Sequence, residues 1–360
     1  MDLPGPRGRG AARDLPNRFR EVWTEPELGE RLEEGWLDEE DVSPRTELIE
    51  DASRSILSEN QSPDIPFRFS LNPYRGCEQG CAYCYARPGH EYLGYSAGLE
   101  FESKIVFKPR AAELLREALG ARRWQPQTIA MSGVTDCYQP VERRLGLTRA
   151  CLEVLLEHRN PAAIITKSHG VVRDRDLLAE LAGHGAAAVN LTITTLDPEL
   201  SGALEPRASR PARRLAAIRA LREAGVPVGV MVAPVIPGLT DHELPAILAA
   251  AAEAGASWAG WILLRLPLAV EPLFVDWLDR HAPARKAKVL GRLRDLRGGR
   301  LNEPRFGARM RGEGPLAAQL AGLFQLGAQR AGLGAPPSLS AAAFRRPRGR
   351  GAQLELFGGA

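Results

Sequence analysis

Long apolar runs are missing from this sequence of 360 residues. The most apolar stretch, 258–275, is interrupted by Arg265, Pro267 and Glu271 before it reaches the ~20 residues that a membrane-spanning helix needs. Residues 1–7 contain no apolar core of a signal segment. Internal repeats of about 20–50 residues, which mark solenoids and propellers, are also absent. We therefore expect a cytoplasmic protein that does not bind membranes.

A strong excess of charge of one sign is missing too, because 47 Lys and Arg face 44 Asp and Glu. Residues 1–20 and residues 336–360 each carry a net charge of +3, which leaves −3 for the rest of the chain. The net charge of the residues between the tails does not indicate a basic surface that binds a nucleic-acid duplex. It is compatible with a local basic patch. Lysine is scarce, so a lysine at a strand end is notable. The lysines are Lys104, Lys108, Lys167, Lys286 and Lys288.

Six short β-rich runs alternate with helical patterns from about residue 64 onward. The predicted strands cover 67–72, 127–134, 162–166, 187–195, 226–235 and 258–266. The predicted helices cover 111–122, 145–157, 174–182, 211–224, 241–254 and 274–280. This alternation indicates an α/β protein with a parallel sheet, either doubly wound or curled into a barrel, and its chemistry should lie at the carboxyl ends of the strands.

Segments of different composition flank this region. Residues 1–63 are expected to form an N-terminal extension that is largely disordered or peripheral, because Gly, Pro and Arg and then acidic residues dominate its first 45 positions. We expect the core over residues 64–300 and a helical, Arg-rich segment over residues 301–335. Residues 336–360 are expected to form a flexible tail.

Cysteines are few and clustered. Three of the five lie within eight residues, at Cys77, Cys81 and Cys84, and the others are Cys137 and Cys151. Without a secretion signal, this clustering favours a metal site over disulfides. Three thiolates do not complete a tetrahedral zinc site, but on a cluster of four irons they leave one iron open to a substrate. The alternatives are zinc completed by His90 and a chance group of buried thiols.

The cysteine motif, Cys77-Glu78-Gln79-Gly80-Cys81-Ala82-Tyr83-Cys84, resembles the signature of the radical S-adenosylmethionine superfamily. The flanking residues 72–76 and 85–94 resemble a bacterial branch that is grouped with spore photoproduct lyase as DNA repair photolyase-like. The resemblance spans roughly residues 50–300. It implies a partial (β/α)6 barrel with flexible N- and C-terminal extensions, which agrees with the six units found from periodicity.

The resemblance also implies the cofactors. Cys77, Cys81 and Cys84 would bind a 4Fe–4S cluster, and Tyr83 would lie at the cofactor site. A reductant such as flavodoxin or ferredoxin would supply the electron that cleaves S-adenosylmethionine to a 5′-deoxyadenosyl radical.

Residues at the strand ends would hold S-adenosylmethionine, again by resemblance. Ser132 and Asp136 lie in the loop that meets the ammonium group, and Lys167 corresponds to a lysine that contacts the carboxylate. The alternatives are a turn or cap at Asp136 and a solvated Lys167. Thr192 matches a cofactor-binding serine. Thr194 shares its strand face with Thr192, which suits ribose hydroxyls, and Val232 would flank the adenine.

One position departs from the relative. The hydrogen-donor cysteine of spore photoproduct lyase aligns with Ser132, so its repair cycle cannot be transferred to this chain. Cys137 is the candidate surrogate donor, and a buried structural cysteine is the alternative interpretation.

Two features favour a nucleic-acid substrate, with DNA repair as the implied setting. One is the pair of Arg/Gly-rich tails, and the other is the C-terminal Gln353-Leu354-Glu355-Leu356-Phe357, which resembles the peptide that binds the DNA sliding clamp. Two alternatives remain: a radical enzyme that modifies RNA, a peptide or a metabolite, and a non-enzymatic metal-containing protein that binds nucleic acid.

Overall fold

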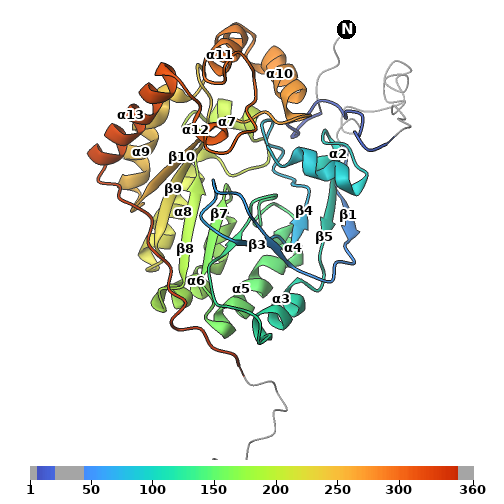
Figure 1. The fold of residues 1–360 in the computed structure, drawn as a ribbon, viewed down its shortest axis with the longest axis vertical. Coiled ribbons are helices and arrows are strands. Elements are labelled where there is room, and N and C mark those ends of the chain that lie inside the picture. The colour runs from blue at the N-terminus through green and yellow to red at the C-terminus, as the bar shows by residue number, and fades with distance from the viewer. Residues whose placement is uncertain (1–5, 21–43, 348–360) are drawn as a thin grey trace, which may run out of the picture.

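The computed structural model describes residues 6–20 and 44–347 (Figure 1). The C-terminal peptide Gln353-Leu354-Glu355-Leu356-Phe357 therefore lies outside the described residues. None of the described helices combines the length and the apolar character needed to cross a membrane.

A seven-stranded sheet forms the centre of the described chain, in the order β10-β9-β8-β7-β6-β3-β2. All neighbouring pairs from β3 to β10 are parallel, and β2 (Leu57–Glu59) pairs antiparallel with β3. No pairing among the described strands joins β10 to β2, so the sheet is an open, partial (β/α)6 barrel. The expected fold class is therefore confirmed. The parallel strands are β3 (Phe69–Leu71), β6 (Ile129–Met131), β7 (Ala162–Thr166), β8 (Ala187–Thr192), β9 (Val228–Val235) and β10 (Ala259–Leu263).

Helices follow the strands, as the alternating pattern predicts. Figure 1 shows α13 (Pro315–Arg330) beside α9 (Leu244–Glu253), and Gly327 allows this close approach because an added Cβ would lie 2.9 Å from Leu248 Cδ1. The main apolar core lies between the sheet and these helices. The other helices of six or more residues are η1 (Arg87–Leu93), α3 (Ala111–Gly120), α5 (Leu147–His158), η2 (His169–Asp174), α6 (Arg175–Gly183), α7 (Pro198–Leu204), α8 (Pro211–Glu223), α10 (Val270–His281) and α11 (Pro283–Asp295).

Four strands lie outside the predicted set. β1 (Glu47–Glu50), β5 (Lys104–Phe107) and β4 (Tyr74–Arg75) form a separate small sheet in the order β1-β5-β4, and β2 forms the edge of the main sheet. Strands of two to four residues are too short to show a periodic pattern, which explains why the sequence did not predict them.

The described part of the N-terminal extension packs against the core. The backbone N–H groups of Gly10 and Ala11 donate to the Glu102 carboxylate at 3.0 and 2.9 Å, and Asn17 donates to the Glu91 carbonyl at 2.9 Å. Glu102 belongs to α2 (Glu100–Ser103), and Glu91 belongs to η1, which follows the cysteines.

Residues 336–347 of the tail lie along the amino edge of the sheet. The Ser340 N–H donates to the Gly185 carbonyl and the Arg345 N–H to the His158 carbonyl, both at 2.9 Å. Gly185 and His158 precede β8 and β7, so this part of the tail lies at the edge opposite the carboxyl ends of the strands.

Candidate active site

A loop that begins directly after β4 carries the three clustered cysteines. Short backbone hydrogen bonds fix its course: the Cys77 N–H donates to the Phe101 carbonyl at 2.9 Å, and the Cys84 N–H donates to the Cys81 carbonyl at 3.2 Å. Gly80 has a φ of +67°, and a Cβ there would lie 2.7 Å from a Glu102 carboxylate oxygen. Glycine is therefore required at this point of the loop.

The three thiols are shielded from solvent. Cys77 and Cys81 are buried and Cys84 is partly buried. Burial raises the pKa of the Cys77 thiol to about 12 and the pKa of Cys81 well above its usual value, because a desolvated thiolate is unfavourable. The ammonium of Lys167 opposes this effect on the pKa of Cys81 and of Cys84. These sulfurs need a positively charged partner to ionise fully.

The placement of the three sulfurs fits an iron–sulfur cluster better than a single metal ion. Among the described residues, no three His, Cys, Asp or Glu side chains converge closely enough to hold one metal ion. The ring of His90 instead packs against Phe101 and Tyr95. In a cluster each thiolate binds a different iron, so the three sulfurs need not converge on one point.

The loop after β6 contains Ser132 and Asp136. Ser132 has a φ of +101°, a conformation that costs energy for a residue with a Cβ and that marks functional sites. The Asp136 carboxylate accepts hydrogen bonds from the Thr166 hydroxyl at 2.7 Å, from the Tyr138 N–H at 2.8 Å and from the Lys167 N–H at 2.8 Å. Asp136 therefore forms a turn, the alternative weighed from the sequence, and also ties this loop to the end of β7.

Lys167 follows β7 directly and reaches across the sheet toward the cysteine loop. Its ammonium lies 3.3 Å from the Ala233 carbonyl of β9 and 5.7 Å from the centre of the Tyr83 ring. The side chain is half-buried. Lys167 therefore lies between the cysteine loop and β9, and it is not a freely solvated lysine.

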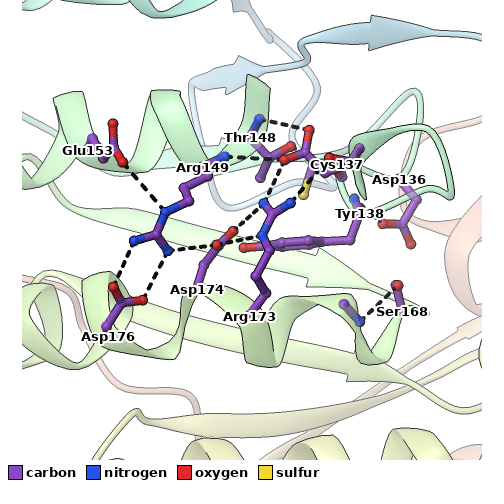
Figure 2. A network of polar contacts seen from close by, with 12 residues as sticks. Asp136, Cys137, Tyr138, Thr148, Arg149, Glu153, Ser168, Arg173, Asp174 and Asp176 are labelled. Carbon is purple, nitrogen blue, oxygen red and sulfur yellow. Dashed lines mark hydrogen bonds and ion pairs between the residues drawn. The ribbon is translucent and has the colours of Figure 1, made fainter. Parts of the chain in front are cut away.

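A charged network connects the loops that follow β6 and β7 (Figure 2). Arg173 donates to Glu142 at 2.6 Å and to Asp174 at 2.7 Å. Arg149 donates to Asp174 at 3.0 Å and to Asp176 at 2.8 Å. The network fixes the relative positions of the loop that holds Asp136 and the segment after Lys167.

Glu205 is not among the residues that the sequence analysis assigns to the site. Its carboxylate is fully buried, accepts a hydrogen bond from Thr194 at 2.7 Å, and bonds the Tyr83 hydroxyl and the Arg214 guanidinium. The nearby charge of Arg214 lowers the pKa of Glu205 despite its burial. Tyr83 and Thr194 are thus joined through one carboxylate. The segment Glu205-Pro206-Arg207, which matches a Glu-Pro of spore photoproduct lyase, was the available signal.

Thr192, Val232 and Cys137 are all buried. Thr192 ends β8 and Val232 lies in the middle of β9. Cys137 is inaccessible to solvent, and its N–H lies 3.4 Å from the Ser132 hydroxyl. The structure thus groups Tyr83, Thr194 and Lys167 near the cysteines and places Cys137 inside the apolar core.

A partial parallel barrel with a three-cysteine loop at the carboxyl edge of its strands defines a class of iron–sulfur enzymes. The sequence model of the Radical SAM superfamily matches residues 71–251. An uncharacterized protein of Mycobacterium tuberculosis (strain ATCC 25618 / H37Rv) is 38% identical over 234 residues, which cover 64% of this chain and 68% of the relative. The chain belongs to the Radical SAM superfamily.

Two further comparisons agree. An uncharacterized protein of Methanocaldococcus jannaschii is 29% identical over 202 residues, which cover 56% of this chain and 73% of the relative. Among solved structures, spore photoproduct lyase complexed with dinucleoside spore photoproduct has a TM-score of 0.56 at 16% identity, with 79% of this chain and 80% of that chain covered. A double mutant of the same enzyme with bound AdoMet gives the same values. This likeness concerns the fold.

The family uses a 4Fe–4S cluster and S-adenosylmethionine, and the residues of this loop fit the cluster. The fit rests on three thiols within one loop, two of them buried and that of Cys84 partly buried, and on the neighbouring ammonium of Lys167. When bound, the cluster supplies the electron that cleaves S-adenosylmethionine. Cys77, Cys81 and Cys84 would hold the cluster in this loop, which largely excludes water, with Lys167 and Tyr83 beside it.

Proposed function

We propose that this protein is a radical S-adenosylmethionine enzyme that generates a 5′-deoxyadenosyl radical and acts on DNA. The observation that carries the first part is the three-cysteine loop, largely shielded from solvent, beside Lys167 at the carboxyl edge of the barrel. Cys77, Cys81 and Cys84 hold the cluster. Lys167 pairs with the carboxylate of S-adenosylmethionine, because a lysine ammonium is a compact point charge that suits a carboxylate.

The remaining predicted residues complete the cofactor site in this proposal. Asp136 and Ser132 line the side that meets the ammonium group of S-adenosylmethionine. Thr192 and Thr194 lie at the end of β8, where hydroxyls meet the ribose, and Val232 provides an apolar contact for the adenine. Tyr83 is held in place by Glu205 and Thr194.

DNA as the substrate has independent support. The fold is similar to that of spore photoproduct lyase, which has been solved with a dinucleoside spore photoproduct. Ser132 stands where that enzyme has its hydrogen-donor cysteine, so the proposed chemistry is radical formation and hydrogen abstraction without that donor. Cys137 serves as the donor in this proposal only if its burial is relieved when substrate binds.

Anaerobic reconstitution with iron and sulfide, followed by an assay for 5′-deoxyadenosine with dithionite as reductant, tests the proposal. We expect formation of 5′-deoxyadenosine that increases when ultraviolet-damaged DNA is added. Cys81→Ala is the matched inactive control, and Cys151→Ala is the control for cysteine loss elsewhere. Stimulation by RNA or a peptide in place of DNA would assign a different substrate. If the protein binds zinc and leaves S-adenosylmethionine intact, the assignment as a radical S-adenosylmethionine enzyme is refuted.

Two partners belong to the proposal. A flavodoxin or ferredoxin supplies the electron in the cell, and the DNA sliding clamp binds Gln353-Leu354-Glu355-Leu356-Phe357. The clamp contact rests on the sequence of the peptide, whose two apolar anchors would each contribute about 1.5–3 kcal/mol when buried, less the cost of ordering. Binding to purified clamp should be lost in a Leu356→Ala/Phe357→Ala double variant. Equal binding by both proteins would refute the contact.

A further inference from the structure

A cavity of about 670 Å³ opens between the loops that follow β6, β7 and β8. These loops lie at the carboxyl edge of the sheet, the same edge as the cysteine loop. Side chains from all three loops line the cavity, so it is formed by the fold and not by one segment. The polar side chains that matter for its chemistry are Arg143, His169, Arg173, Arg175, Ser209 and Arg213.

The charge in this cavity is strongly positive. The acidic side chain that lines it, Glu142, already accepts hydrogen bonds from Arg173 at 2.6 Å, from the Thr148 N–H at 3.0 Å and from the Tyr74 hydroxyl. Among the described residues, no carboxylate lies within ion-pair distance of Arg143, Arg175 or Arg213. Their charges are therefore available to an anion. This is unexpected in a chain whose residues between the two tails carry a net charge of −3.

His169 also experiences the positive charge of this cavity. The Arg213 guanidinium donates to His169 Nδ1 at 3.2 Å, which requires an unprotonated nitrogen at that position. Burial first, and then the charges of Arg213 and Arg143, lower the pKa of His169. The ring is therefore neutral near pH 7 and does not add to the charge, but its Nε2 can donate to an acceptor.

A smaller cavity of about 100 Å³ continues toward the cysteines. It shares Tyr138, Arg143 and Ser209 with the larger cavity, and it is also lined by Gln79 and Ser168. Gln79 lies between Cys77 and Cys81, and Ser168 follows Lys167 directly. An anion in the large cavity would therefore lie next to the loops that form the proposed cofactor site.

We propose that this cavity binds the phosphate groups of a nucleic-acid strand and so positions the strand at the radical site. Arginine guanidinium groups together with serine hydroxyls form the donor set that recognises phosphate oxygens. Arginines without a carboxylate partner lie on three separate helices, Arg143 on α4 (Glu142–Leu145), Arg175 on α6 and Arg213 on α8. They match the successive charges of a strand better than the single charge of a small anion. The proposal rests on the proposed function, because it assigns a binding site to the DNA substrate proposed there.

Binding of a fluorescent single-stranded DNA to the full-length reconstituted protein tests the assignment. The test variant is Arg143→Gln/Arg213→Gln. The matched control is Arg122→Gln/Arg123→Gln, since these exposed arginines precede β6 at the opposite edge of the sheet. We expect the test variant to bind about ten- to a hundredfold more weakly, as for loss of charge-assisted hydrogen bonds. The slope of log affinity against log salt should fall by about 1 to 1.5. The control should match the wild type in both.

The other outcomes test the cavity, the class of ligand and the radical chemistry separately. Equal affinity and salt slope in wild type and test variant would overturn the cavity as the phosphate site, and if the double variant does not fold, Arg175→Gln replaces it. Displacement of the DNA by millimolar inorganic phosphate from the wild type, with no effect on residual binding of the variant, would support the site. Binding of inorganic phosphate by a wild type that does not bind the DNA would overturn the nucleic-acid assignment. Formation of 5′-deoxyadenosine without DNA, measured on the wild type, tests the radical chemistry separately.

Discussion

Arg87 and Glu102 form an ion pair from which solvent is completely excluded, next to the loop of cysteines. The Arg87 guanidinium also donates to the carbonyls of Cys81 at 2.9 Å and Gly98 at 2.9 Å. Glu102 in turn accepts from the backbone of Gly10 and Ala11. One buried pair thus connects the N-terminal segment, α2 and the loop that presents the thiols.

Removal of one partner of this pair should destabilise the protein strongly. Glu102→Ala leaves the Arg87 charge buried and unpaired, so we expect the free energy of unfolding in urea to fall by about 3–5 kcal/mol. Glu113→Ala is the matched control, because Glu113 pairs with Arg110 at the exposed surface and its loss should change that free energy by less than ~1 kcal/mol. Equal effects of the two substitutions would show that the buried pair does not hold the loop.

The second prediction concerns the iron content of cysteine variants. Cys77→Ala, Cys81→Ala and Cys84→Ala should each lose most of their iron after anaerobic reconstitution, whereas Cys137→Ala and Cys151→Ala should retain about four irons per chain. The reason is position, since Cys137 and Cys151 are fully buried members of the main apolar core and do not belong to the cysteine loop. Iron and zinc are measured by elemental analysis. Zinc in place of iron, or full iron in any of the first three variants, would contradict the assignment.

The sequence predicted the parallel strands because each is a short apolar run bounded by turn residues. The predicted strand 162–166 coincides with β7, and the end of 226–235 coincides with the end of β9. β1 and β5 were not predicted because their pairing depends on tertiary contacts between segments that lie far apart in the sequence, such as Glu47 and Lys104.

Part of the candidate site could also be predicted from the sequence, and part could not. The cysteines are visible in the sequence because ligands within one loop have a fixed spacing. The role of Glu205 depends on a buried contact with Arg214 and Tyr83, and spacing does not reveal burial. The basic cavity is hidden as well, because its arginines come from segments that follow three different strands and the net charge averages them with the acidic residues between.

A third prediction concerns pH. Burial lowers the pKa of His90 to about 4, and the charge of Glu100 opposes this only in part. The unfolded chain binds a proton at a pKa near 6.5, so between about pH 6.5 and pH 4 it holds more protons than the folded chain. The stability contribution of neutral His90 is therefore present above pH 6.5 and is lost as the pH falls toward 4.

His90→Phe keeps an aromatic ring between Tyr95 and Phe101 and removes the titration. We expect the wild type to lose about 3 kcal/mol more stability than this variant between pH 7 and pH 4, since each pKa unit corresponds to about 1.4 kcal/mol. Urea unfolding at several pH values provides the measurement. Parallel pH profiles of the two proteins would show that His90 does not stay neutral in the folded state.

The last prediction concerns Lys167, whose ammonium lies between the Ala233 carbonyl and the Tyr83 ring. If it pairs with the carboxylate of S-adenosylmethionine, Lys167→Ala should weaken binding by about 1.5–3 kcal/mol, or ten- to a hundredfold, and Lys167→Arg should restore part of the loss. Lys286→Ala is the control, because Lys286 pairs with Asp279 at the surface. Equilibrium titration of the reconstituted proteins measures the affinity, and iron content should stay equal in all of them. An unchanged affinity in Lys167→Ala would limit this lysine to its contacts with Ala233 and Tyr83, and the carboxylate would then need another cation at the same edge of the barrel.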